Sequence, residues 1–67
     1  MASGIFFNFK GKTHEIKLSI FEKPTVWVAV VDGEMEVFFD ADTNLDIIDI
    51  IELGVTAWVE EFSDVNF

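Results

Sequence analysis

The chain has 67 residues, of which 51% are hydrophobic and 15% aromatic, and its 13 acidic and 4 basic side chains give a formal net charge of -9. We expect a single domain over residues 1–67, because a chain of this length holds one core at most. The absence of cysteine excludes disulfides and thiolate metal sites as reinforcement for that core. A mean hydropathy of +0.37, with eight phenylalanines and two tryptophans, excludes intrinsic disorder.

The charges are distributed unevenly along the chain. Residues 1–30 hold four lysines and two glutamates, a sum of +2, whereas residues 31–67 hold eleven carboxylates and no base, a sum of -11. The longest apolar run, Val26 to Val31, is much shorter than the ~20 residues of a membrane-spanning helix. The first residues also lack the basic segment of a secretion signal. We therefore expect a cytoplasmic protein with no membrane contact.

Alternating apolar residues predict two β-hairpins in the first forty residues. A two-residue turn that begins at Gly11 would pair Phe7 with Ile16 in the first hairpin. The predicted strands cover about residues 4–10, 14–21, 25–31 and 34–39.

The second hairpin is indicated by Asp32-Gly33, a strong signal for a type I′ turn, which would pair Val30 with Met35. The connector between the hairpins would then place Ile20 opposite a strand-three valine. On this register, the side of the sheet that faces the helix carries Ile5, Phe7, Ile16, Leu18, Ile20, Val26, Val28, Val30, Met35, Val37 and Phe39.

The segment of about residues 43–62 has the pattern of a helix, with Thr43 as its N-cap and Asp46 in the position of a capping box. Gly54 leaves a second interpretation open, in which the helix ends there and a short fifth strand begins at Val55. The stripe expected to face the sheet consists of Ile47, Ile48, Ile51, Val55, Trp58, Val59 and Phe62. The predicted fold class is α+β, a four-stranded antiparallel meander in the order 1-2-3-4 with a C-terminal helix on one face.

No pattern of catalytic or cofactor-binding residues is present. His14 is the only histidine, and its neighbour Glu15 points to the opposite face of the strand, so we expect His14 to be structural or solvated. Residues 40–46 alternate oxygen ligands as a calcium loop does, but Leu45 and Ile51 occupy the positions of its diagnostic glycine and glutamate. We expect no enzymatic activity, no cofactor and no metal.

Three groups of side chains are candidates for binding another macromolecule. The acidic side of the predicted helix carries Asp42, Asp46, Asp49, Glu52 and Glu60. An aromatic row on the outer face of the sheet would consist of Phe6, Phe21, Trp27 and Phe38. A strip of apolar and small residues on the helix would consist of Ile50, Leu53, Gly54 and Ala57. The corresponding simple interpretations are a solvated acidic face, an aromatic row partly covered by neighbouring residues, and a broad helix face lying flat on the sheet.

These features predict a non-enzymatic protein–protein interaction module that forms a homodimer. In its most specific version, the protein is an inhibitor of the phage anti-defence or host-takeover kind, whose carboxylate-rich half blocks the basic, nucleic-acid-facing surface of an enzyme. Direct nucleic-acid binding is not expected, because the chain has no arginine and its negative charge repels phosphate. The alternatives are a homo-oligomeric structural or assembly subunit and an antitoxin-like regulator.

Overall fold

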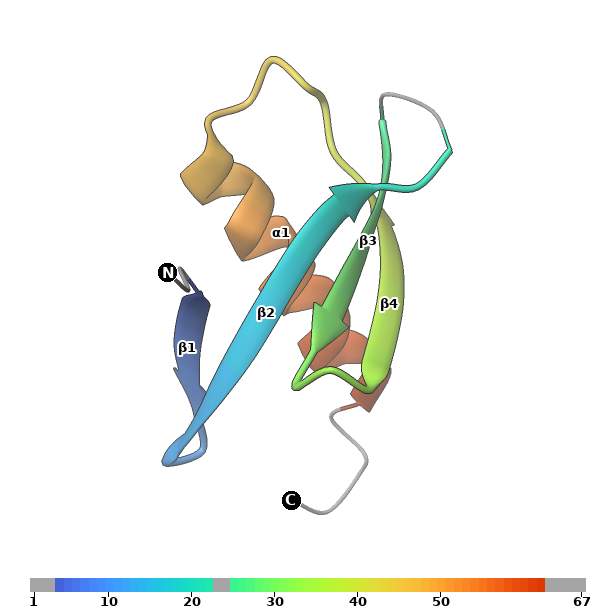
Figure 1. Cartoon of the computed structure of the whole chain (residues 1–67). Helices are drawn as coiled ribbons and strands as arrows, with labels where there is room; N and C mark the ends of the chain where they lie inside the picture. The colour runs from blue at the N-terminus through green and yellow to red at the C-terminus, as the bar shows by residue number, and fades with distance from the viewer. Residues whose placement is uncertain (1–3, 23–24, 63–67) are drawn as a thin grey trace.

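A computed structural model of the chain describes residues 4–22 and 25–62. The elements are β1 (Ile5–Phe9), β2 (Lys12–Ile20), β3 (Val26–Val31), β4 (Met35–Asp40) and α1 (Ile47–Phe62) (Figure 1). The sheet is antiparallel with the order β1-β2-β3-β4, which confirms the predicted α+β meander. In Figure 1 the helix lies behind the strands and covers one face of the sheet.

The first hairpin turns one residue earlier than predicted, at Lys10 and Gly11. Both residues have positive φ, 54° and 79°, as a type I′ turn requires. Phe7 therefore pairs with His14 rather than with Ile16, so the predicted register is wrong by two residues. The type I′ turn is favoured because its twist matches that of the flanking strands. Since the shift is even, every side chain keeps its predicted face.

The second hairpin contains one residue more than predicted. Asp32 and Gly33 have the positive φ values of a type I′ turn, 56° and 74°. Glu34 then follows as an extra residue, so that Val31 pairs with Met35. This bulge moves β3 by one position relative to the prediction, and an odd shift turns every side chain of the strand to the other face.

The faces of β3 are therefore the reverse of those predicted. The residues that point to the helix side are Trp27, Ala29 and Val31, and those that point away from it are Val26, Val28 and Val30. Ala29 and Val31 are fully buried. The prediction was wrong because all six residues of β3 are apolar, so the strand has no hydrophobic alternation from which a face could be chosen.

A buried tryptophan on α1 forms the centre of the core. Trp58 is fully buried, and its ring stands edge-on to Phe7 and Phe9 with centroid distances of 5.3 and 5.4 Å. The imidazole of His14 lies 5.0 Å from the same indole. The buried apolar residues are Ile16, Ala29, Val31, Val37, Ala41, Ile50 and Trp58.

A tight turn precedes α1 and displaces the predicted N-cap. The Asp42 carboxylate accepts a hydrogen bond from the Asn44 backbone N–H (2.9 Å), and its carbonyl accepts one from Leu45 (3.0 Å). Thr43 lies inside this turn and does not cap the helix, because local side-chain bonds of this kind compete with helix formation. Asp46 takes the cap position, and its carbonyl accepts the first helical hydrogen bond at 3.1 Å.

The helix is continuous through Gly54, so the fifth strand expected to begin at Val55 is not formed within the residues that the structure describes. Its buried line consists of Ile50, Gly54 and Trp58, whereas Ile47 and Ile48 are exposed, contrary to the predicted stripe. Within residues 4–22 and 25–62, no helix is long and apolar enough to cross a membrane.

Candidate functional site

The face of the sheet that α1 leaves uncovered is apolar at its centre. Val26, Val28 and Val30 lie along β3 and are half-buried. Phe38 on β4 and Phe21 at the end of β2 are 51% and 57% exposed, and their rings meet edge-on with centroids 4.7 Å apart. These five residues are called the outer-face patch below. Such a contiguous exposed apolar surface is typical of a binding interface.

Charged side chains border the outer-face patch. The cross-strand pairing places Lys17 beside Val30, and Val30 beside Glu36, so that one row crosses three strands from a base to an acid. At one end of the patch, Asp40 pairs with Val26. An apolar centre with a charged border is the usual layout of a protein–protein interface.

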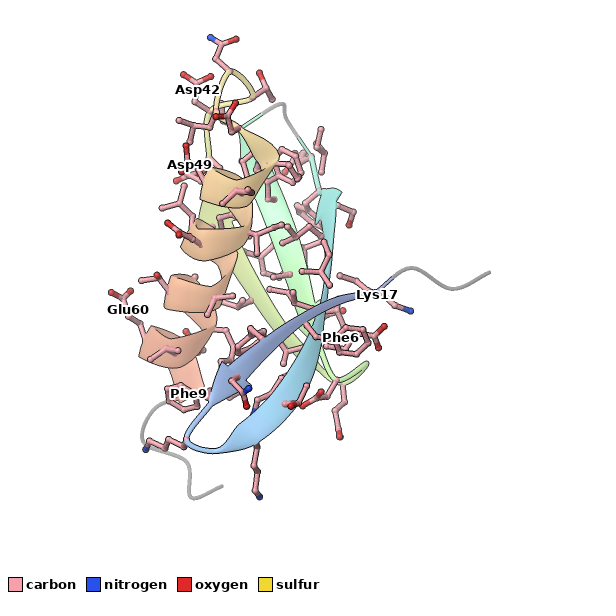
Figure 2. All side chains as sticks on the ribbon, turned by 90° about the vertical axis from the view of Figure 1, so that its left-hand side faces the viewer. Phe6, Phe9, Lys17, Asp42, Asp49 and Glu60 are labelled. Atoms are coloured by element: carbon pink, nitrogen blue, oxygen red, sulfur yellow. The ribbon has the colours of Figure 1, made fainter. Side chains whose placement is uncertain are left out.

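Three of the four aromatic residues predicted for the outer face lie there. Phe21 and Phe38 are in contact, and Phe6 on β1 is 62% exposed. Figure 2 shows Phe6 and Lys17 on the side of the sheet away from α1. Trp27 is a correction, because it lies on the helix side and its indole Nε1–H donates a 3.0 Å hydrogen bond to the Ala41 carbonyl. This placement follows from the reversed faces of β3.

The apolar strip predicted on the helix is not a free surface. It consists of Ile50, Leu53, Gly54 and Ala57. Ile50 and Gly54 are buried against the sheet. A Cβ placed on Gly54 would lie 3.1 Å from Leu18 Cδ2 and 3.3 Å from the Phe39 ring. The small residue therefore allows the sheet, rather than a second helix, to approach α1 closely, and Leu53 is the most exposed member of the strip.

The five predicted acidic residues are all exposed. They are Asp42, Asp46, Asp49, Glu52 and Glu60, called the acidic side below. In Figure 2, the labelled Asp42, Asp49 and Glu60 project from the opposite side of the molecule to Lys17. Among the described residues, no lysine lies within ion-pair distance of a carboxylate, so within that part of the chain no lysine neutralises the acidic side.

His14 is buried and has a partner that the sequence analysis missed. Its Nδ1 lies 2.6 Å from Asp32 Oδ2, and the Glu15 backbone N–H donates to Asp32 Oδ1 at 3.1 Å. The hydrogen bond with His14 lowers the pKa of the Asp32 carboxyl, the Glu15 amide adds to this effect, and desolvation opposes it. The signal was the position of His14 on the same strand face as the core residue Ile16. Of its two predicted roles, the structure supports the structural one.

No pocket opens in the described part of the chain, and no three metal-binding side chains gather there. No protein-family model, curated protein or solved structure matches the chain. The candidate functional surfaces are the outer-face patch and the acidic side, which lie on opposite sides of the molecule.

Proposed function

We propose that this protein is a non-enzymatic binding module that attaches through its acidic side to a basic surface of another protein. The observation that supports this proposal is the exposure of all five carboxylates of the acidic side, with no lysine in ion-pair contact among the described residues. Helix α1 itself contains no base. A surface of one sign of charge accelerates association with a surface of the opposite sign and opposes contact with like-charged partners.

The length of the acidic side suggests the kind of basic surface that it fits. From Asp46 to Glu60 the chain advances 14 residues, or about 21 Å at the helical rise of ~1.5 Å per residue. Enzymes that act on nucleic acids hold the phosphate backbone with rows of lysine and arginine, and they present a basic surface of at least this length. The specific form of the proposal is an inhibitor that occupies the nucleic-acid-facing surface of such an enzyme, in the manner of phage anti-defence or host-takeover proteins.

The proposal competes with the simpler view that the acidic side only keeps a small apolar protein in solution. The two views differ in what charge reversal does to binding. Asp46→Lys combined with Asp49→Lys should abolish capture of the partner if the acidic side is the binding surface. Glu22→Lys combined with Glu34→Lys is the matched control, because it makes the same change in net charge at exposed positions away from the helix.

Affinity capture from a cell lysate, followed by mass spectrometry, tests the proposal when it is done with the wild type and both double variants. We expect the wild type and the control to capture a nucleic-acid-binding enzyme, and added duplex DNA to release that enzyme. The Asp46→Lys, Asp49→Lys variant should not capture it. If this variant captures the same proteins and only loses solubility, the acidic side is a solvating surface and the proposal is wrong.

A further inference from the structure

The outer-face patch lies on the opposite side of the sheet from α1, so it is available when the acidic side is occupied. Phe21 and Phe38 are more than half exposed beside the three half-buried valines of β3. A sheet with one bare apolar face buries it most directly against a second sheet, since two sheets pack face to face at ~10 Å.

The charges that border the patch favour a second copy of this chain. Lys17, Val30 and Glu36 form one row across β2, β3 and β4, with the valine in the middle. A two-fold axis that runs along β3, in the plane between two such sheets, exchanges β2 of one copy with β4 of the other. Lys17 of each copy then faces Glu36 of the other, and Val30 faces its own counterpart. A wholly basic partner would instead be repelled by Lys17.

We propose that two copies of this protein form a dimer by packing their outer-face patches together about this two-fold axis, with two reciprocal Lys17–Glu36 ion pairs. The interface is isologous, as in most two-fold dimers, because the same row supplies both the base and the acid. The helices lie outside the resulting sandwich. The acidic sides of the two copies are therefore separated by more than the ~8 Å over which charges interact strongly at physiological salt.

The same geometry leaves Phe6 outside the interface. β1 lies two strands from the axis on one side, whereas only β4 lies beyond β3 on the other side, so β1 has no strand opposite it in the second copy. Phe38, in contrast, lies on β4 and inside the overlap. Substitutions of these two exposed phenylalanines therefore form a matched pair. They distinguish dimerisation through this interface from nonspecific hydrophobic association.

Sedimentation equilibrium over about 10–500 µM tests the proposal, because a three-strand footprint is at the small end of specific interfaces and micromolar affinity is expected. Lys17→Glu alone places two glutamates opposite each other, and Glu36→Lys alone places two lysines opposite each other. We expect each single variant to raise the dimer Kd at least tenfold. An equimolar mixture of the two variants should restore wild-type affinity, because every facing pair is then of opposite charge.

Three controls accompany the mixture, and circular dichroism verifies that each variant is folded. Phe38→Glu should abolish the dimer, Phe6→Glu should retain it, and Glu52→Lys should retain it while matching the charge change of Glu36→Lys. A wild type that remains monomeric at the highest concentration overturns the proposal. A mixture that associates no more tightly than its components also overturns it. Neither outcome affects the proposed function of the acidic side, which the charge-reversal capture experiment tests separately.

Discussion

His14 on β2 and Asp32 in the turn between β3 and β4 are joined by a 2.6 Å hydrogen bond between Nδ1 and Oδ2. The bond connects the first hairpin to the turn of the second, and the imidazole itself packs against the rings of both Phe7 and Trp58. The Asp32 carboxylate also accepts the Glu15 backbone N–H. The two hairpins are thus held in register by a side chain as well as by the strand ladder.

This pair predicts a specific loss of stability in acid. The pKa of the Asp32 carboxyl is lower in the folded protein than in the unfolded chain. The stability that this carboxylate contributes is therefore complete above its unfolded pKa of ~3.9, and it is lost as the pH falls through the lower folded pKa. Asp32→Asn keeps the shape and tolerates the positive φ but removes this titration. Urea unfolding between about pH 2 and 6 should show a smaller decline for the variant than for the wild type. Equal declines would show that Asp32 does not contribute.

The reversed faces of β3 predict losses of stability of different size for two adjacent valines. Val31→Ala should lower the unfolding free energy by about 2–3 kcal/mol, because Val31 is fully buried and its removal leaves a cavity. Val30→Ala should cost less than about 1 kcal/mol in the monomer, because Val30 lies on the outer face. Urea denaturation at low protein concentration measures both. A larger cost at Val30 than at Val31 would support the register expected from a two-residue turn.

The backbone conformation of Lys10 indicates that a substitution at this position would stabilise the protein. Its φ of 54° is unfavourable for a lysine, and asparagine adopts this conformation more readily at the first position of a type I′ turn. Lys10→Asn should raise the unfolding free energy by about 0.5–1 kcal/mol, less a small loss from the contact between Lys10 Nζ and the Phe9 ring. Thermal denaturation measures the effect. Lys12→Asn is the control, since it removes the same charge from a strand position and should not stabilise.

The close contact between α1 and the sheet at Gly54 limits the size of the side chain that this position tolerates. Gly54→Val should destabilise the protein by about 1–3 kcal/mol, because even a Cβ would lie 3.1–3.3 Å from Leu18 and Phe39. In Gly54→Ala the gain in helix propensity of ~1 kcal/mol opposes a smaller clash, so this variant should be the more stable of the two. Chemical denaturation compares them. Equal stability would mean that Leu18 and Phe39 move aside freely.

The sequence predicted the elements whose local signals agree with one another. β2 alternates apolar and polar residues, and β4 does so except at Phe38. The helix has both apolar spacing and acidic residues at its start, so the existence and order of these elements were predicted correctly. β3 contains no polar residue, and its face depends on Glu34, whose role as a bulge has no sequence signature. The reversal moved Trp27 out of the predicted aromatic row and brought three valines to the outer face.

The candidate surfaces were predictable to different degrees for the same reason. The acidic side depends on the identity of carboxylates along α1 and in the turn before it, and these can be read directly from the sequence. The pairing of His14 with Asp32 depends on the register between β2 and β3, which no local pattern determines. The burial of Gly54 and Ile50 depends on the rotation of α1 about its axis, and the broad apolar surface of the helix allowed two rotations.

The bulge at Glu34 also determines where the chain tolerates a change in length. Val31 pairs with Met35, so removing Glu34 would leave the two residues Asp32 and Gly33 between an unaltered pair of strands. A deletion at this one position therefore preserves the register between β3 and β4, whereas a deletion inside β2 would turn the rest of that strand's side chains to the opposite face of the sheet. Single-residue deletions in variants of this protein should consequently be tolerated at residue 34 and not within β2.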